Sequence, residues 1–220
     1  MTKKNYINTL KNIDPWVAEN TFYLKATPER ISKFMSHYEI FNKIKNLKGD
    51  VVECGVFRGA SLSRFMSFDK IFKSNKKFYA FDAFGKFPDS GTKEDKTFSK
   101  KHNKLGYGIK KKDLDRLLKK KGFKNFTLIE GDVLKTLNVF LKKKKKICLL
   151  HLDLDVYEAT KHVLKNLFPL IVKNGIILID DYSHISNTTK AINNFLKVKK
   201  KLKIKKFTFP CRPSYIIKDF

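Results

Sequence analysis

Five short apolar runs, each with an acidic residue at or near its end, constrain the fold of this chain more than any other feature. Between them lie stretches in which apolar residues recur at helical spacing, so buried strands and helices alternate. Such alternation predicts an α/β fold with a Rossmann-like, doubly wound and mostly parallel sheet joined by right-handed crossovers. The runs are VVECG at 51–55, KFYAFDAF at 77–84, FTLIEGD at 126–132, ICLLHLD at 147–153 and GIILIDD at 175–181.

The two ends of the chain follow other patterns. Thr27 and Pro28 are typical of a helix start, and the apolar spacing of residues 31–44 continues that helix, so we expect a helical extension at 1–48 ahead of one domain at 49–220. After the last run we expect one more helix and then two β-like runs, at 205–210 and 214–219, which form a hairpin and complete seven strands. The longest irregular stretch, about 85–109, is either a lid over a ligand or a tolerated insertion.

Cysteine usage and hydropathy indicate where such a protein works. The three cysteines are far apart and lack the paired spacing of a zinc site, so we expect them to be reduced. The first residues contain no apolar stretch of signal-peptide length, and no segment is long enough to span a bilayer. We therefore expect a soluble, cytoplasmic protein without a membrane span.

The formal net charge of +27 would ordinarily indicate a nucleic acid or an anionic membrane as partner. However, only five of the 48 basic residues are arginine, the side chain that suits bidentate phosphate and base contacts. We attribute the lysine excess to A- and T-rich codons and expect no nucleic-acid partner. The lysine runs could still attract an acidic substrate.

Acidic residues and glycines follow the first three runs, where ligands bind in open parallel sheets. The turn from Glu53 to Gly59 lets the backbone approach a ligand closely, but it lacks the GxGxxG pattern, which disfavours an NAD-dependent oxidoreductase. A carboxylate at Glu53 could hold the ammonium of an amino-acid ligand. Asp82 could accept ribose hydroxyls. Asp132 could border an adenine or, equally well, cap the next helix.

The fourth and fifth runs end in the densest acidic group of the sequence, His151, Asp153 and Asp155 followed by Asp180 and Asp181. Adjacent strands would bring these carboxylates together, and they would repel one another unless a cation or protons neutralised them. Mg²⁺ is the simplest such cation. The alternative is that each aspartate caps the helix that follows it. Capping accounts for one carboxylate in each turn and leaves the doubled ones unexplained.

These motifs together resemble the macrocin O-methyltransferase family, which methylates sugar hydroxyls of macrolides. The resemblance covers about residues 49–196 and rests on ECGVFRG, DAFGKFP, HLDLDVYEAT and IDDY. It implies S-adenosyl-L-methionine as methyl donor, Mg²⁺ as metal and a small-molecule glycosyl substrate. It places the metal on Asp153, Asp180 and Asp181. It places the donor at the glycine turn and after the second strand, on Gly55, Arg58, Gly59, Ser61, Asp82 and Phe84.

The proton acceptor does not follow from the resemblance. Catechol O-methyltransferases, which are more distantly similar, carry a lysine base where this chain has Val156, and Leu154 stands where the family often has glycine. Asp153, Asp155, His151 and His102 are therefore all candidate bases. A nucleic-acid methyltransferase and a non-catalytic Rossmann-like binding protein remain alternatives. The resemblance also implies a homo-oligomer.

Overall fold

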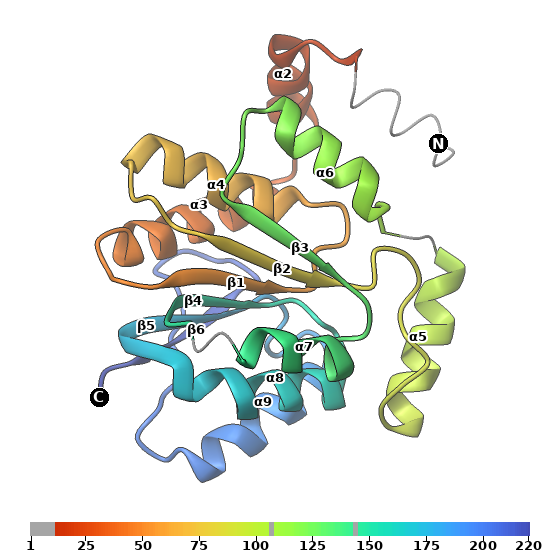
Figure 1. Ribbon diagram of the computed structural model, residues 1–220, viewed down its shortest axis with the longest axis vertical. Coiled ribbons are helices and arrows are strands. Elements are labelled where there is room, and N and C mark those ends of the chain that lie inside the picture. The colour runs from red at the N-terminus through yellow and green to blue at the C-terminus, as the bar shows by residue number, and fades with distance from the viewer. Residues whose placement is uncertain (1–11, 106–107, 143–144) are drawn as a thin grey trace.

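The computed structural model describes residues 12–105, 108–142 and 145–220, and its elements alternate as the apolar runs predict (Figure 1). In chain order the elements are α2 (Pro15–Lys25), α3 (Pro28–Ile44), β1 (Asp50–Cys54), α4 (Ala60–Phe72), β2 (Phe78–Asp82), α5 (Lys93–Leu105), α6 (Lys111–Lys120), β3 (Phe126–Glu130), α7 (Val133–Leu141), β4 (Ile147–Leu152), α8 (Tyr157–Leu167), the 3₁₀ turn η1 (Phe168–Leu170), β5 (Ile171–Ile179), α9 (Ser186–Val198) and β6 (Ser214–Lys218).

The strands form one sheet in the order β3-β2-β1-β4-β5-β6. The pairs from β3 to β5 are parallel, and β6 pairs with β5 in the antiparallel direction. The chain runs outward from β1 to β3 and then returns to β4 on the other side of β1. The strand order thus reverses between β1 and β4, which is where open α/β sheets bind ligands.

Helices cover both faces of the sheet, and each face has its own apolar core (Figure 1). One core lies under α3, α4 and α6, and the other lies under α7, α8 and α9. Three α3 side chains, Ile40, Phe41 and Ile44, have no exposed surface and belong to the first core. The helix before β1 is therefore part of the packing of the sheet, while the domain boundary at residue 48 stays a prediction.

Two expectations differ from the structure. The Rossmann-like fold is confirmed, but the described residues form six strands and not seven. The expected strand at 205–210 makes a single antiparallel bridge, between Lys205 and Tyr215. Pro210 and Pro213 follow this bridge, and proline has no N–H to donate to a strand ladder.

The stretch expected to be irregular, 85–109, contains the helix α5. Its start is fixed by a reciprocal cap: the Asp95 N–H donates to Thr92 Oγ1 at 3.1 Å, and the Thr92 N–H donates to Asp95 Oδ2 at 3.2 Å. Acidic residues in the first turn and basic residues in the last further stabilise such a helix. Among the described residues, no helix is long and apolar enough to cross a bilayer.

Candidate active site

A cavity of about 330 Å³ lies at the carboxyl ends of β1, β2, β3 and β4, at the reversal of strand order. Its walls come from the loops after these strands and from α5, which supplies Ser99 and His102. Predicted site residues from four different strand ends meet in it. They are Gly55, Asp82, Asp132, Asp153 and Asp155.

The turn after β1 has a shape that only glycine fits. Gly55 has a φ of +91°, and a Cβ at that position would lie 1.8 Å from the carbonyl oxygen of Asp153. Gly59 has a φ of +82°, and a Cβ there would lie 2.4 Å from a methyl group of Leu114. The turn is therefore packed directly against the acidic segment after β4. Arg58 is exposed at its outer side, with its guanidinium 5.0 Å from the centre of the Phe57 ring.

Asp82 links the turn after β1 to the loop after β2. Its Oδ2 accepts from the N–H groups of Val56 at 2.7 Å and Phe57 at 2.9 Å, and its Oδ1 accepts from the Phe84 N–H at 2.6 Å. The Phe84 ring is buried in the core under α4. Asp82 thus shapes the pocket wall and at the same time borders the cavity.

Asp132 is the N-cap of α7, where its Oδ1 accepts from the Leu134 N–H at 3.0 Å. The capping alternative considered for this residue is therefore realised. Because Asp132 also borders the cavity, a contact with a ligand there remains compatible with the cap.

Glu53 and His151 lie behind the turn, with no exposed surface. Glu53 Oε1 accepts a hydrogen bond from the Ser61 hydroxyl of α4 and lies 3.5 Å from His151 Nδ1. Glu53 Oε2 has no hydrogen-bond partner among the described residues. Ser61 and His151 therefore contact Glu53 directly.

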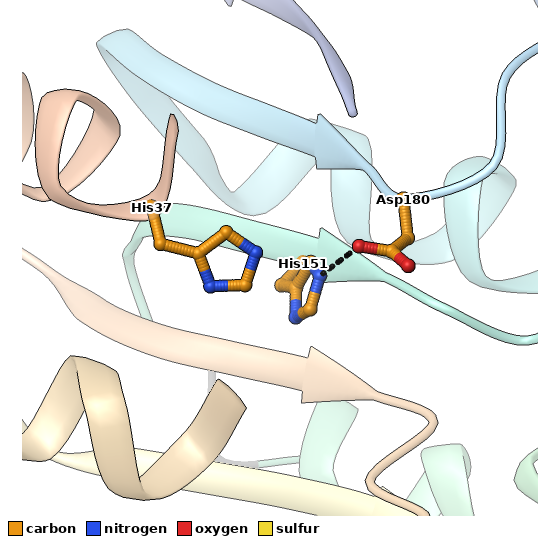
Figure 2. A group of neighbouring side chains, drawn as sticks. All are labelled: His37, His151 and Asp180. Atoms are coloured by element: carbon orange, nitrogen blue, oxygen red, sulfur yellow. Dashed lines mark ion pairs between the residues drawn. The ribbon is translucent and has the colours of Figure 1, made fainter. Parts of the chain in front are cut away.

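His151 lies between two carboxylates, as Figure 2 shows for the side nearest Asp180. Its Nε2 is 3.7 Å from Asp180 Oδ1. Burial alone would lower the pKa of His151, but Asp180 and Glu53 outweigh it and raise this pKa to about 10. The ring is therefore an imidazolium at neutral pH, and it stabilises both buried carboxylates.

His37 of α3 is the third member of the group in Figure 2, and its ring meets the His151 ring edge-on at 5.3 Å. Its Nδ1 lies 3.1 Å from an Arg64 guanidinium nitrogen, and the ring stacks on Phe65. Burial, with His151 and Arg64 nearby, lowers the pKa of His37 well below its usual value. Although His37, His151 and Asp180 are close enough to share a metal, the adjacent cations disfavour one there.

Asp153, Asp155 and Asp181 form a second group, with ligand oxygens within 4.8 Å of one another. Burial and the neighbouring carboxylates raise the pKa of Asp153 well above its usual value and that of Asp155 to about 7. Asp155 has a φ of +63°, and its Oδ1 is buried without a hydrogen-bond partner among the described residues. Arg212 forms an ion pair with Asp181. This group has the oxygen donors and the excess negative charge that a hard divalent cation needs.

Asp180 lies near that group but pairs with residues outside it. Its Oδ2 lies 2.6 Å from the Lys33 ammonium, and its Oδ1 faces His151. Although burial opposes it, the contacts with His151 and Lys33 lower the pKa of Asp180. The structure therefore brings together two of the three predicted metal aspartates, Asp153 and Asp181, and adds Asp155 to them.

Sequence reasoning missed Lys33 and Asp95. Lys33 lies on a helix that we interpreted only as packing, and nothing in the sequence distinguishes it from the many other lysines. Asp95 lies in the stretch that we expected to be irregular. The Thr92-x-x-Asp95 spacing is a capping-box pattern and was a signal for the helix.

Comparisons with known proteins agree with this fold. The profile of the macrocin-O-methyltransferase (TylF) family matches residues 27–206. No curated protein sequence matches the chain. Many solved structures match the chain, and among them are three that share its fold at low identity.

The O-methyltransferase NovP is 18% identical to this chain with a TM-score of 0.76, and the match covers 86% of this chain and 81% of NovP. The calicheamicin methyltransferase CalS11 is 21% identical to this chain with a TM-score of 0.73, and the match covers 97% of this chain and 90% of CalS11. An apo structure of CalS11, described as a TDP-rhamnose 3′-O-methyltransferase, is 20% identical with a TM-score of 0.69, covering 97% and 91%.

Proposed function

Because this chain belongs to the macrocin-O-methyltransferase (TylF) family, we propose that it transfers a methyl group from S-adenosyl-L-methionine to a hydroxyl of a sugar or glycosylated small molecule, assisted by Mg²⁺. One observation carries the proposal: the cavity at the reversal of strand order is bordered both by the glycine turn at Gly55 and by Asp153 and Asp155, which lie next to that turn. A donor and a metal-held acceptor can therefore meet there. The description of CalS11 as a TDP-rhamnose methyltransferase supports a glycosyl acceptor.

The residues around the cavity suit the methyl donor, whose sulfonium supplies the electrophile when it is bound. The volume of about 330 Å³ lies at the lower end of the range for small-molecule sites. Gly55 and Gly59 allow close approach of the backbone, with Arg58 at the rim, while Asp82 and Asp132 offer carboxylates to polar edges. The Phe84 backbone N–H donates to Asp82 and so helps to fix this wall of the cavity. Glu53, held by Ser61, is buried behind the turn and outside the cavity lining, so we propose that its Oε2 reaches an amino group through a bridging water.

Asp153 and Asp181 are the metal ligands that we propose with most support, because they belong both to the set implied by the family and to the group found in the structure. When bound, Mg²⁺ would act as a Lewis acid that lowers the pKa of the acceptor hydroxyl. The family resemblance adds Asp180, which can join them once its ion pair with Lys33 opens. A bound cation would stabilise this buried group of carboxylates, because their negative charges otherwise repel one another.

Asp155 is the proton acceptor that we favour. It borders the cavity, and its Oδ1 has no hydrogen-bond partner among the described residues, so this oxygen can accept a proton. His102 also borders the cavity, and its Nδ1 lies 3.0 Å from the Phe98 carbonyl, which leaves Nε2 as acceptor in the neutral ring. His151 is buried between two carboxylates and acts in this scheme as a positioning residue.

We also propose a homo-oligomer. The helix α2 has no buried residue and exposes Trp16, Tyr23 and Leu24, an apolar surface that a second copy would cover. Sedimentation velocity of the full chain tests this: a monomer at all concentrations would contradict it.

The function is tested by transfer of a labelled methyl group from S-adenosylmethionine with Mg²⁺. Acceptors would include TDP-rhamnose, other nucleotide sugars, simple glycosides and, as the alternative class, structured RNA. We expect label in at least one glycosyl acceptor and a loss of transfer with EDTA. Label only in RNA would replace the proposal with the nucleic-acid alternative. Donor binding without transfer to any acceptor would favour a non-catalytic protein.

A further inference from the structure

Asp95 is a fully buried carboxylate on α5, a helix that stands at the edge of the molecule beside the carboxyl ends of the strands (Figure 1). Its neighbours on the helix, Glu94 and Lys96, are exposed. A charged side chain without water contact needs hydrogen bonds from elsewhere. Asp95 receives them from two segments that lie far from it in the sequence.

The first segment is the start of α8. Asp95 Oδ1 accepts from the Tyr157 N–H at 2.7 Å, and Oδ2 accepts from the Glu158 N–H at 3.0 Å. The N-cap residue of α8 is Val156, whose side chain has no acceptor for these free N–H groups. Asp95 thus caps α8 from another helix. The first N–H group that it binds, at Tyr157, is two residues after Asp155.

The second segment is the start of α9. The Asn187 amide donates to Asp95 Oδ1 at 3.1 Å. Asn187 follows the turn that carries Asp180 and Asp181. One carboxylate therefore connects α5 with the segments that follow both acidic strand ends.

The same helix forms a wall of the cavity. Ser99 lies one turn after Asp95 on the same face of α5, and both Ser99 and His102 border the cavity. Further along, the Asn103 side chain pairs with the Phe87 backbone at 2.8 and 3.2 Å. Asp95 anchors the amino-terminal half of this wall, and Asn103 anchors the carboxyl-terminal half.

We propose that Asp95 is a positioning residue with two effects. Its hydrogen bonds hold α5 closed over the cavity, and the same bonds fix the start of α8 and hence the turn with Asp153 and Asp155. The identification of the cavity as the methyl-donor site rests on the proposed function. The structural part does not, since it concerns the ligand-free chain.

The test replaces the charge and keeps the shape, in Asp95→Asn. The matched control is Glu94→Gln, which removes the same charge from the adjacent, exposed position. Trypsin digestion of the ligand-free full chain is followed by mass spectrometry, because α5 carries the cleavage sites Lys93, Lys96, Lys100, Lys101 and Lys104. We expect cleavage within α5 to rise about tenfold in Asp95→Asn and by less than about twofold in Glu94→Gln, which loses only a favourable first-turn charge. Unchanged cleavage in a folded Asp95→Asn protein would overturn the proposal.

A second variant covers the case in which Asp95→Asn does not fold. Asn187→Ala removes one donor and should raise α5 cleavage by a smaller factor; no rise would contradict the role of this contact. Affinity for S-adenosylhomocysteine is measured in parallel, with an expected loss of about tenfold in Asp95→Asn. Faster cleavage with unchanged affinity would overturn the link to the cavity. Failure of the wild-type chain to bind would instead count against the proposed function.

Discussion

The ammonium of Lys33 lies 2.6 Å from Asp180 Oδ2, although 147 residues separate the two in sequence. The Lys33 side chain comes from α3, which precedes the sheet, and reaches the carboxyl end of β5. Asp180, Asp153 and Asp181 together raise the pKa of Lys33 against the opposing effect of burial. A lysine ammonium thus supplies positive charge at the acidic edge where the family resemblance implies a metal.

Removal of this ammonium should favour the metal. In Lys33→Met we expect Mn²⁺, used as a spectroscopic substitute for Mg²⁺, to bind about tenfold more tightly, since a competing charge next to Asp180 is lost. Electron paramagnetic resonance of free Mn²⁺ measures the affinity. Lys43→Met on the same helix, which removes an exposed ammonium, is the control. Equal affinity in wild type and Lys33→Met would mean that Asp180 does not take part in metal binding.

Asp180→Asn tests the metal assignment by changing the other partner of the Lys33–Asp180 ion pair. We expect turnover to fall by at least about a hundredfold, because a metal ligand and a partner of His151 are lost together. Affinity for S-adenosylhomocysteine should stay within about threefold. Steady-state kinetics and calorimetry provide the two values, with Asp219→Asn as a surface control. Equal losses of turnover and cofactor affinity would argue against a metal role for Asp180.

His151 should make stability depend on pH. Its folded-state pKa of about 10 lies above the usual value of about 6.5, so its contribution is complete below pH 6.5 and is lost as pH rises toward 10. His37, whose pKa is lowered, is neutral throughout this window. Urea unfolding of the metal-free chain should show a decline of a few kcal/mol between about pH 6.5 and about pH 9.5. His151→Gln should flatten that decline, whereas the exposed His184→Gln should not; parallel curves for all three proteins would refute the imidazolium assignment.

Gly55→Ala tests whether the cofactor turn and the acidic segment depend on each other. The new methyl group would meet the Asp153 carbonyl at 1.8 Å and would require a φ of +91°, so we expect a loss of more than about 3 kcal/mol in unfolding free energy. Gly85→Ala is the control, because the nearest atom to its Cβ is 3.9 Å away. Thermal and urea unfolding give the comparison. Equal stability of the two variants would show that the turn relaxes without cost.

The strand ends were the part of the site that sequence could predict. Buried parallel strands require continuous apolar runs, and the residues after them share one edge, where Asp82, Asp132 and Asp153 do line the cavity; their roles in binding stay predictions. The edge of the sheet was less predictable. A run such as 205–210 has β-like composition, but strand pairing depends on N–H donors, which Pro210 at its end and Pro213 after it do not supply.

Side-chain directions could not be predicted. Asp180 and Asp181 are adjacent, yet one pairs with Lys33 and the other with Arg212, because consecutive side chains leave a strand end toward different neighbours. Those neighbours come from α3 and from the loop before β6, and only tertiary packing brings them to the site. Asp95 was missed for a related reason, since its partners Tyr157 and Asn187 lie 62 and 92 residues away.

The most direct test of the account is calorimetric titration of the full chain with S-adenosylhomocysteine, with and without Mg²⁺, and with NAD as control. We expect binding of S-adenosylhomocysteine with a Kd on the order of micromolar and no heat from NAD. Absence of S-adenosylhomocysteine binding under both conditions would contradict the account.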